Sequence, residues 1–358
     1  MNEIWILGAA VRSGRVVAAH LAAAHLSLVL VGRDAIRLRE LAGAIGGDPR
    51  IVRVGSVDAV VTELARSTPA VVINTIGPFS ETALPIARAC PPGTHYVDLA
   101  NDLVAVPRLL GLDDEAVSSG RTLVTGAGFG VLAVESVMLK VCEAQPPAAR
   151  ARVDVVPAID SEGGQIGSAF AATVIDVLVT GGRRYAHNRL VRTGLGSHPE
   201  RLTLPDGSSV HTGSGPSGDL EVAHRVSGAP FVVAASSAAP SAPVVRAVLP
   251  AVSALLRMPA FRTMATRRIA GIRTKPHERV REFSWAHARV QWASGATREG
   301  WLRAGEGTAF TAAVVAEVAR RLARNEGRPG AFTPGALFGP DLAIHADARS
   351  AMIPWLSR

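Results

Sequence analysis

Cysteine is scarce in this sequence, and its scarcity limits the chemistry that the chain can support. Cys90 and Cys142 are the only cysteines and lie far apart along the chain. The sequence therefore indicates neither a disulfide framework nor a cysteine-based zinc cluster. The histidines also lack the spacing of metal ligands. We expect the protein to bind no metal ion.

Several common catalytic motifs are missing as well. The sequence has no Gly-x-Ser-x-Gly elbow and no His-Glu-x-x-His helix, which argues against a serine hydrolase and a zinc protease. It has no Tyr-x-x-x-Lys pair either, because Ala100 and Arg189 stand four positions after the two tyrosines, Tyr96 and Tyr185. Short-chain dehydrogenase chemistry is therefore disfavoured.

Long uninterrupted apolar runs are absent too. The N-terminal residues MNEIWILG include an acid and no basic segment, unlike a secretory signal. The apolar stretch from Ala229 to Met258 is interrupted by Arg246 and by several prolines, so it is not a typical membrane span. These features predict a soluble, cytoplasmic protein.

The formal net charge is +8, and arginine supplies almost all of it. Lys140 and Lys275 are the only lysines, and the basic residues are spread over the whole chain, so the charge does not indicate nucleic-acid binding. One cluster spans Arg257–Arg281 and contains Arg257, Arg262, Arg267, Arg268, Arg273, Lys275, Arg279 and Arg281. It could contact an anionic acyl-carrier protein or a membrane surface, or it could be the solvated face of amphipathic helices.

The length and the apolar content are sufficient for two domains. The chain has 358 residues, of which 48% are hydrophobic, and domains usually contain roughly 100–200 residues. In its N-terminal part, short apolar runs alternate with segments of helical spacing. The expected strands are Ile4–Leu7, Leu28–Val31, Ile51–Val54, Ala70–Ile73, Tyr96–Leu99 and Thr122–Val124. This alternation predicts an α/β fold with a doubly wound parallel sheet of the Rossmann type.

The loop after the first strand has the small residues of a diphosphate-binding turn. In a doubly wound sheet, ligands bind beyond the carboxyl ends of the strands. Small residues there let the backbone approach a diphosphate at the positive end of the next helix. The expected cofactor contacts are Gly8, Ala10, Arg12, Ser13 and Gly14. Val11 stands where such a turn often carries a glycine, and we expect its side chain to point toward the sheet or the following helix.

The loop after the second strand favours NADP over NAD. A free ribose 2′-hydroxyl is usually bound by an acid at the strand end, whereas a 2′-phosphate is bound by a guanidinium. Arg33 precedes Asp34 here, so we expect NADP(H), with both residues beside the ribose. Alternatively, Arg33 is merely exposed and Asp34 is the N-cap of the next helix.

The later loops line the same crevice in the order that a dinucleotide needs. Ser56 would lie beside the adenine, and Gly128 belongs to a flexible loop after the sixth strand. The loop after the fourth strand turns near the middle of the dinucleotide, and the loop after the fifth lies near the nicotinamide. Their expected cofactor contacts are Thr75, Ile76, Gly77, Pro78 and Phe79 in the former and Ala100 and Asn101 in the latter.

With these loops identified, the chain resembles the saccharopine dehydrogenase-like reductases, a broad family that includes saccharopine reductases and bacterial trans-acting enoyl reductases. The resemblance runs nearly from end to end, and NTIGPF followed by GTHYVDL is its most specific part. It rests on GAAVRSGR (8–15), VGRD (31–34), INTIGPFSETALPIARAC (73–90), GTHYVDLAND (93–102), GAGFGVLAVES (126–136), SEGGQIGSAF (161–170), PSGDLEVAHRVSGAP (216–230), GTAFTAAVVAEVARRL (307–322) and GAFTPGALFGPDLA (330–343).

The resemblance implies an NADP-dependent reductase built from three parts. These are a dinucleotide-binding domain over 1–130, a mixed α+β substrate and dimerisation domain over 131–305, and C-terminal helices over 306–358 that pack back on the first domain. Val11 and Gly130 depart from the family pattern. Relatives usually carry a glycine at the first position and commonly an acid at the second, so the resemblance leaves the catalytic step unassigned.

The second domain is expected to contain an antiparallel or mixed sheet. The sequence pattern predicts strands over Ala151–Val156, Leu220–Val226, Phe231–Ala235 and Glu282–Trp292, and helices over Ile166–Thr180 and Pro243–Arg257. This domain is rich in Ala, Val and Leu, so we expect it to form a largely apolar pocket.

Few polar side chains could donate a proton or stabilise charge that develops on a substrate. Tyr96 and Asp98, in the fifth strand, and Tyr185 and His187, in the second domain, are the candidate catalytic residues. Alternatively, Tyr96 is a core residue whose hydroxyl is hydrogen-bonded, and Tyr185 and His187 lie in a surface loop.

The sequence thus predicts an NADPH-dependent reductase that transfers hydride to the C=C or C=O bond of a hydrophobic, acyl-like or polyketide-like small molecule. Two alternatives remain open. One is reduction of an imine, as in saccharopine reductases, and the other is a non-catalytic nucleotide-binding scaffold or sensor that acts through the basic cluster. The size and apolar content suggest a homodimer.

Overall fold

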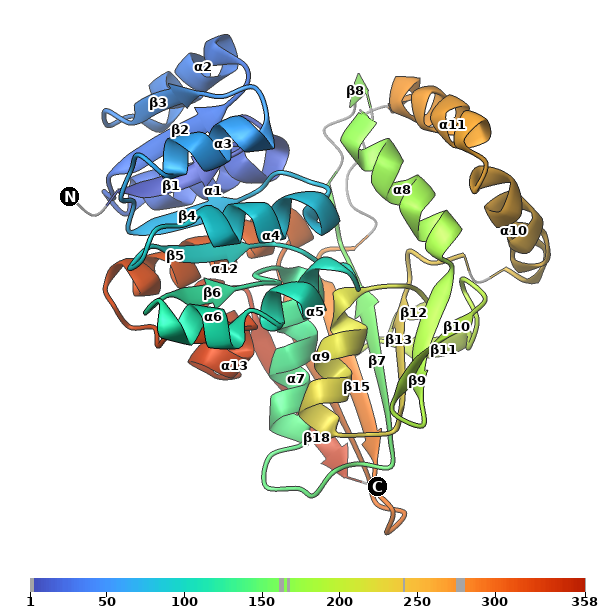
Figure 1. The fold of residues 1–358 in the computed structure, drawn as a ribbon. Coiled ribbons are helices and arrows are strands. Elements are labelled where there is room, and N and C mark those ends of the chain that lie inside the picture. The colour runs from blue at the N-terminus through green and yellow to red at the C-terminus, as the bar shows by residue number, and fades with distance from the viewer. Residues whose placement is uncertain (1–2, 161–163, 166–167, 241, 275–280, 358) are drawn as a thin grey trace. The chain divides into compact units, whose positions relative to one another are not determined.

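The computed structural model describes residues 3–160, 164–165, 168–240, 242–274 and 281–357 (Figure 1). The chain divides into two compact units. The first comprises Met1–Leu132 and Thr308–Ala348, and the second comprises Ala133–Gly307 and Arg349–Arg358. Each unit is therefore assembled from two separate stretches of the chain.

The first unit is built around a sheet of seven parallel strands. In spatial order they are β17 (Gly330–Phe332), β6 (Thr122–Val124), β5 (His95–Asp98), β4 (Val71–Asn74), β1 (Ile4–Leu7), β2 (Leu28–Gly32) and β3 (Arg50–Arg53). The strand order reverses between β1 and β4, which places a topological switch point at their carboxyl ends. The predicted doubly wound parallel sheet is confirmed, and β17 is an additional edge strand.

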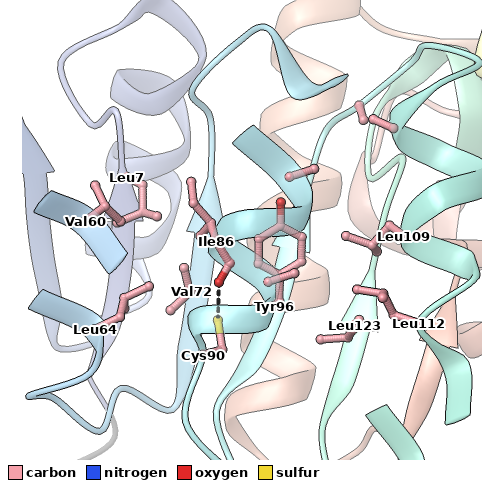
Figure 2. Packing of buried hydrophobic residues seen from close by; sticks show 14 of the residues in the cluster. Leu7, Val60, Leu64, Val72, Ile86, Cys90, Tyr96, Leu109, Leu112 and Leu123 are labelled. Atoms are coloured by element: carbon pink, nitrogen blue, oxygen red, sulfur yellow. Dashed lines mark hydrogen bonds between the residues drawn. The ribbon is translucent and has the colours of Figure 1, made fainter. Parts of the chain in front are cut away.

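Helices cover both faces of this sheet (Figure 1). They are α1 (Arg12–Ala23), α2 (Ala35–Ile45), α3 (Val57–Leu64), α4 (Phe79–Ala89), α5 (Ala105–Leu110), α6 (Asp113–Ser118), α12 (Gly307–Ala323), α13 (Pro334–Phe338) and α14 (Leu342–Ala346). Figure 2 shows Leu7, Val72 and Tyr96 of the strands in one cluster with Leu64 and Ile86 of the helices. Because alternate strand residues point to opposite faces and both faces are covered, the strands read as continuous apolar runs.

The second unit contains a mixed sheet of nine strands. Its main path is β10 (Arg189–Thr193), β9 (Gly182–Ala186), β13 (Phe231–Ser236), β7 (Arg150–Val156), β15 (Ser284–Gln291), β16 (Thr297–Ala304) and β18 (Ala351–Ser357), and the hairpin of β11 (Glu200–Thr203) and β12 (Ser209–Ser214) joins it at β13. β13 and β7 run parallel, and the other described pairs in this sheet are antiparallel. The predicted mixed α+β character of this part is confirmed.

The helices of the second unit form two groups. After a π-helical turn over Phe129–Ala133, α7 (Val134–Val141) packs with α9 (Gly218–Ser227) against the nine-stranded sheet. The other group contains α8 (Ser168–Thr180), α10 (Pro243–Leu256) and α11 (Pro259–Gly271), which contact one another, while the short strands β8 (Gly164–Gln165) and β14 (Arg273–Thr274) pair. The predicted helices over 166–180 and 243–257 agree with α8 and α10, although residues 166–167 lie outside the described residues.

The predicted strand over Leu220–Val226 is wrong, because this segment lies within the helix α9. The first turn of α9 contains the acids Asp219 and Glu221, its last turn contains Arg225, and Gly228 ends it with a φ of +60°. Charges placed in this way are favourable to the helix dipole, and a left-handed glycine is a common helix terminator. The helix is largely buried, so its apolar residues do not show a clear 3.6-residue period.

The C-terminal segment also differs from the expected set of helices. α12, α13 and α14 are helices with residues in the first unit, but Gly330–Phe332 forms β17 of the same unit. Ala351–Ser357 forms β18, which pairs with β16 in the second unit. Short edge strands of this kind are determined by the partner strand rather than by local propensity, so the sequence pattern did not predict them.

Candidate cofactor-binding site

The turn between β1 and α1 brings two parts of the backbone into close contact. Gly8 has a φ of +78°, a left-handed conformation that favours glycine. At Gly14, a Cβ atom would lie 2.3 Å from the Gly8 carbonyl oxygen and 2.9 Å from the Cα of Ala9. Only glycine therefore fits at position 14, and α1 begins directly against the end of β1, as in a diphosphate-binding turn.

The N-terminus of α1 differs from those of α2 and α3. The N-cap residue of α1, Val11, makes no side-chain cap hydrogen bond, and the first turn of this helix contains no acid. In contrast, Asp34 caps α2 and Ser56 caps α3 by accepting hydrogen bonds from their first-turn amides. Uncapped first-turn amides attract anions. The predicted contacts Ala10, Arg12 and Ser13 lie at this end of α1, and each is exposed or half-buried.

Val11 does not pack as expected. It is the N-cap of α1, with a φ of −78° and a ψ of 163°, and 47% of its surface is exposed. The expectation that its side chain points into the sheet or the following helix is therefore not met, because the extended backbone at the N-cap leaves the side chain accessible to solvent.

Two arginines meet at the carboxyl ends of β2 and β3. Arg33 follows β2 and is exposed, and the Nε of Arg53, the last residue of β3, donates to the Arg33 carbonyl oxygen over 3.3 Å. The Asp34 carboxylate accepts from the amides of Ile36 (3.0 Å) and Arg37 (3.2 Å), so it acts as the N-cap in the alternative interpretation. Arg33 and Arg53 are the groups here that suit a 2′-phosphate. The sequence reasoning missed Arg53, although a charged residue at a strand end was the available signal.

Hydrogen bonds fix the loop after β4 to its surroundings. Thr75 Oγ1 donates to the Leu7 carbonyl oxygen over 2.8 Å. Asn74 Oδ1 accepts from the amide of Ile76 over 3.0 Å, and Thr82 Oγ1 donates to the Ile76 carbonyl oxygen over 2.6 Å. The side chain of Thr75 and the backbone of Ile76 are therefore engaged within the protein. The exposed or half-buried members of the loop are Gly77, Pro78 and Phe79.

Tyr96 and Asp98 lie in a buried hydrogen-bond network at the ends of β5 and β6. Asp98 Oδ1 accepts from Thr125 Oγ1 (2.8 Å) and from the amides of Ala100 (3.0 Å) and Gly126 (3.1 Å). Its Oδ2 accepts from the Tyr96 hydroxyl over 3.0 Å. The network therefore holds the starts of the loops that follow both strands.

The burial of Tyr96 and Asp98 argues against their direct contact with a substrate. Both residues have no exposed surface. Burial raises the pKa of Asp98 to about 6, and burial together with Asp98 raises the pKa of Tyr96 well above its ordinary value. The geometry favours the alternative that Tyr96 is a core residue with its hydroxyl bonded. The hydrogen bonds indicate that Tyr96 and Asp98 position the loops, and their catalytic role stays a prediction.

The loops after β5 and β6 meet at Asn101 and Gly130. A Cβ atom at Gly130 would lie 2.3 Å from Nδ2 of Asn101, so the carboxamide of Asn101 occupies the space beside this glycine. At Gly128, a Cβ atom would lie 3.2 Å from Cγ2 of Thr311, whose Oγ1 accepts from the Phe129 amide over 3.1 Å. Asn101 is exposed and is thus an accessible polar side chain at the predicted nicotinamide end.

Tyr185 and His187 belong to the second unit, in the hairpin of β9 and β10. The Tyr185 hydroxyl donates to Glu221, and its ring stacks on His224 at 3.8 Å. Burial and Glu221 raise the pKa of Tyr185. His187 is exposed and forms the hairpin turn with Asn188, with φ values of +51° and +59°. The structure thus gives Tyr185 a packing contact and His187 a turn position rather than a shared catalytic arrangement.

The sheet of the second unit carries a buried charged network that the sequence reasoning missed. Asp154 accepts from Arg152 (2.8 Å) and from Thr212 Oγ1 (2.6 Å), and its other oxygen lies 3.1 Å from His287 Nδ1. His287 Nε2 lies 2.8 Å from Glu299 Oε1. Burial alone would raise the pKa of Asp154, but His287 and Arg152 outweigh it and lower that pKa. Burial would lower the pKa of His287, but Asp154 and Glu299 raise it.

A cavity of about 400 Å³ opens beside this network. Arg150, Arg152, Arg184 and Arg289 contribute to its lining, and Arg289 binds Glu200 through two contacts of 2.7 and 2.8 Å. This lining is basic, because cationic side chains outnumber the single carboxylate among the residues that form it. The cavity therefore does not fit the largely apolar substrate pocket that we expected in this part of the chain.

Comparison with known proteins identifies the relatives of this chain. No protein-family model matches it. Trans-acting enoyl reductases of Mycobacterium leprae (strain TN) and Mycobacterium ulcerans (strain Agy99) are 30% and 32% identical to it over 135 residues, which is 36% of this chain and 32% of each relative. The chain thus matches about a third of the length of these curated relatives.

A solved structure supplies the likeness in fold. The apo saccharopine dehydrogenase (L-Glu forming) of Saccharomyces cerevisiae aligns with 99% of this chain and 100% of its own, with a TM-score of 0.62 and 13% identity. The fold of this chain is therefore that of saccharopine dehydrogenase, and its expected resemblance to the saccharopine dehydrogenase-like NADP-binding reductases is confirmed.

Proposed function

We propose that the protein is an NADPH-dependent reductase of a hydrophobic small-molecule or acyl substrate. One observation carries the proposal: the uncapped start of α1 stands at the switch point between β1 and β4. There, Gly8 and Gly14 bring the strand end and the helix together without side chains between them. This arrangement fits a diphosphate, whose charge the first-turn amides would stabilise.

The arginines at the ends of β2 and β3 support NADP(H) rather than NAD(H). Arg53 donates to the Arg33 carbonyl oxygen, and this contact supports the proposal that both arginines bind the 2′-phosphate. Asp34, the acid that could instead have bound a ribose hydroxyl, caps α2. NADPH, when bound, supplies the hydride for the reduction.

Hydrogen bonds within the protein hold the loops after β4, β5 and β6 in place before a ligand binds. The Thr75 hydroxyl donates a hydrogen bond to β1, and the Asp98 carboxylate accepts hydrogen bonds from the amides of Ala100 and Gly126. A site that is fixed in advance loses little free energy to reorganisation. We propose Asn101, which is exposed in the loop after β5, as the side-chain donor to the bound ligand.

The proposed reaction is the reduction of a C=C or C=O bond. The sequence relatives are named trans-acting enoyl reductases, and this supports a C=C bond in an acyl or polyketide-like substrate. Reduction of an imine is the alternative within the same class of enzyme. The two differ in one requirement, because imine reduction of a supplied ketone needs an added amine.

Titration with NADPH and with NADH, followed by nicotinamide fluorescence, tests the cofactor. We expect NADPH to bind at least roughly tenfold more tightly, and Arg33→Ala and Arg53→Ala each to weaken NADPH binding by roughly tenfold or more, since a charged hydrogen bond contributes about 1.5–3 kcal/mol. Arg39→Ala is the matched control, because Arg39 is an exposed arginine of α2 that bonds to its own helix. Failure of both nucleotides to bind would contradict the proposal.

Oxidation of NADPH in the presence of hydrophobic enones, ketones and ketone–amine mixtures tests the reaction. We expect turnover of an enone or ketone without amine. A strict requirement for the amine would establish imine reduction instead. If NADPH binds but none of these compounds is reduced, the nucleotide-binding scaffold becomes the better account of the protein.

A further inference from the structure

An apolar surface lies on the helices α10 and α11 of the second unit. α10 buries only Leu256, and α11 buries no residue. More than half of the exposed large apolar side chains in the described parts of the chain lie between residues 244 and 272. They are Val244, Val245, Val248, Leu255, Met258, Met264 and Ile272, each 45–78% exposed. A concentration of this kind marks a binding surface more often than an ordinary solvated face.

The apolar residues of α10 form a stripe along one side of the helix. The stripe consists of Val244, Val248, Ala251 and Leu255, all of which are exposed. Residues three and four positions apart lie above one another on a helix. The opposite side carries Leu256 and Ser253, and Ser253 Oγ donates to the Val179 carbonyl oxygen of α8 over 3.4 Å. α8 therefore packs on one side of α10, and the stripe is on the other.

Positive charge accompanies this stripe, and acids do not. The sequence contains no Asp or Glu from Val222 to His277. The described arginines next to the stripe and along α11 are Arg257, Arg262, Arg267, Arg268 and Arg273. An ion pair joins Arg262 to Asp176 of α8. The two helices thus supply cations that their own sequence does not neutralise. Lys275 and Arg279 of the predicted basic cluster lie outside the described residues.

A shallow depression on α11 is lined by both apolar and basic side chains. Its volume is about 570 Å³, and Met264, Arg267 and Arg268 contribute to its lining. Two guanidinium groups beside a flexible apolar side chain suit the phosphate and the glycerol region of a lipid headgroup, because guanidinium binds phosphate in a planar fork.

The length of each of these helices is less than a membrane span requires. Among the described residues, no single helix is long and apolar enough to cross a membrane, and α10 and α11 pass that test only as a pair bent by 114°. The 14 residues of α10 extend about 21 Å at 1.5 Å per residue, whereas the hydrocarbon core is about 30 Å thick.

We propose that α10 and α11 dock the protein on an anionic lipid bilayer, with the α10 stripe in the interface and the α11 arginines on lipid phosphates. An amphipathic helix with an apolar stripe and flanking basic residues binds bilayers in this manner. The proposal goes beyond the reductase activity and does not depend on it.

The composition of the surface favours lipid over an acidic protein. Its exposed large apolar side chains are Val, Leu, Ile and Met, and the segment from Pro243 to Thr274 contains no Trp or Tyr. Protein interfaces obtain much of their binding energy from Trp, Tyr and Arg seated in pockets. A stripe of aliphatic side chains along a helix instead matches the fluid hydrocarbon of a bilayer.

Co-sedimentation of the full chain with vesicles tests the proposal. We expect strong binding to vesicles of phosphatidylglycerol mixed with phosphatidylcholine, and weak binding to phosphatidylcholine alone. The double substitution Val248→Asp and Leu255→Asp should weaken binding by roughly tenfold or more, because it puts carboxylates into the interface. Leu190→Asp is the matched control, since Leu190 is a 44% exposed apolar residue of β10 in the same unit. Arg267→Glu with Arg268→Glu should lower binding and its salt dependence.

Two outcomes would overturn the docking on lipid. One is a lack of binding to the mixed vesicles, or equal binding by the wild type and the double aspartate variant. The other is displacement of the wild type from vesicles by soluble polyglutamate without any effect of the aspartates, which would indicate a charge-only surface for an acidic protein. NADPH titration of the same variants keeps this result separate from the cofactor proposal, because their nucleotide affinity should not change.

Discussion

Asp98 in the first unit and Asp154 in the second are both fully enclosed, yet their pKa values move in opposite directions. Asp98 accepts hydrogen bonds from neutral donors only, namely two hydroxyls and two backbone amides. Its pKa is raised to about 6 by burial. Asp154 is hydrogen-bonded to His287 and Arg152, and these interactions outweigh burial and lower its pKa.

The difference lies in the counter-charge and not in the degree of burial. Neutral donors offset only part of the cost of removing a carboxylate from water, whereas a guanidinium and an imidazolium can offset all of it. The network of the first unit should therefore remain stable when Asp98 is protonated or is replaced by a neutral side chain. In the second unit, Asp154 is the fully buried carboxylate that Arg152 and His287 share, and each of these two residues has one further, partly exposed carboxylate partner, Glu200 or Glu299.

Loss of the negative charge at Asp154 should have the largest effect. Asp154→Asn removes the buried carboxylate that Arg152 and His287 share and leaves them only the partly exposed Glu200 and Glu299. Because the breaking of a buried ion pair is strongly destabilising, it should lower the free energy of unfolding by about 3–5 kcal/mol. Urea unfolding followed by tryptophan fluorescence measures the change, because Trp285 and Trp301 belong to the sheet that contains the network.

Asp176→Asn is the control for this measurement. Asp176 pairs with Arg262, and the side chains of both residues are more than 40% exposed. An exposed ion pair contributes less than about 1 kcal/mol, so this variant should unfold almost as the wild type does. Equal losses for Asp154→Asn and Asp176→Asn would refute the distinction between buried and exposed pairs in this unit.

Asp98 should show a smaller loss and a different pattern. Asp98→Ala leaves the hydroxyls of Tyr96 and Thr125 and two amides without an acceptor, and it should cost about 3–4 kcal/mol. Asp98→Asn keeps an acceptor oxygen and creates no unpaired cation, so it should cost only about 1 kcal/mol. The change from Asp to Asn should thus lower the free energy of unfolding much less at Asp98 than at Asp154.

Cys90 provides a readout for the first unit. It is 3% exposed, and burial raises the pKa of its thiol to about 12, so it should react with a thiol reagent only when the unit opens. The urea dependence of its labelling in a Cys142→Ser background gives the stability of the unit. If Asp98→Asn proves as costly as Asp154→Asn, the comparison between the networks fails.

The pH dependence of the first unit should follow from Asp98. Its folded pKa of about 6 lies above the ordinary 3.8, so its contribution to stability is complete below pH 3.8 and is lost as the pH rises through about 6. Relative to Asp98→Asn, the wild type should lose up to about 3 kcal/mol over this range, since one pKa unit is worth about 1.4 kcal/mol. Cys90 labelling at several pH values measures the loss, and a gain with rising pH would disprove it.

The smallest effect is expected at His287. Its pKa is raised by Asp154 and Glu299 against the effect of burial, so its charge contributes fully below pH 6.5 and this contribution is lost as the pH rises through the folded pKa. His287→Gln should therefore cost more stability at pH 5 than at pH 9. Tryptophan fluorescence in urea measures both values, and a cost that is independent of pH would mean that His287 is neutral in the folded protein.

The sequence predicted those elements whose pattern is determined locally. β1, β2, β4, β5 and β6 are apolar runs between turn residues, and the switch point follows from their order. α9 was predicted as a strand because it is buried on several sides, and β17 and β18 were missed because they pair with distant strands. Long-range pairing leaves little trace in a short stretch of sequence.

The candidate site was predictable to a similar degree. The glycine turn and Arg33 could be found from their place after a strand. Arg53 carried the weaker signal of a charged residue at a strand end, but its contact with Arg33 depends on the pairing of β2 and β3 and could not be predicted. The role of Tyr96 and Asp98 in positioning the loops could not be predicted from the sequence pattern either. Alternation along a strand does not show whether a polar side chain meets solvent or, as here, Thr125 and the Gly126 amide.

On the ribosome, the first unit remains incomplete after Leu132 has emerged. β6 receives its neighbour β17 only after nearly two hundred further residues, when the Ala331 amide reaches Asp113 (2.8 Å) and Thr122 Oγ1 reaches the Arg328 carbonyl oxygen (2.8 Å). Until then β6 is an open strand edge, which attracts other chains. The nascent protein must therefore keep its N-terminal third protected throughout the synthesis of the second unit, and a gene fragment that ends at Leu132 should yield an aggregating product.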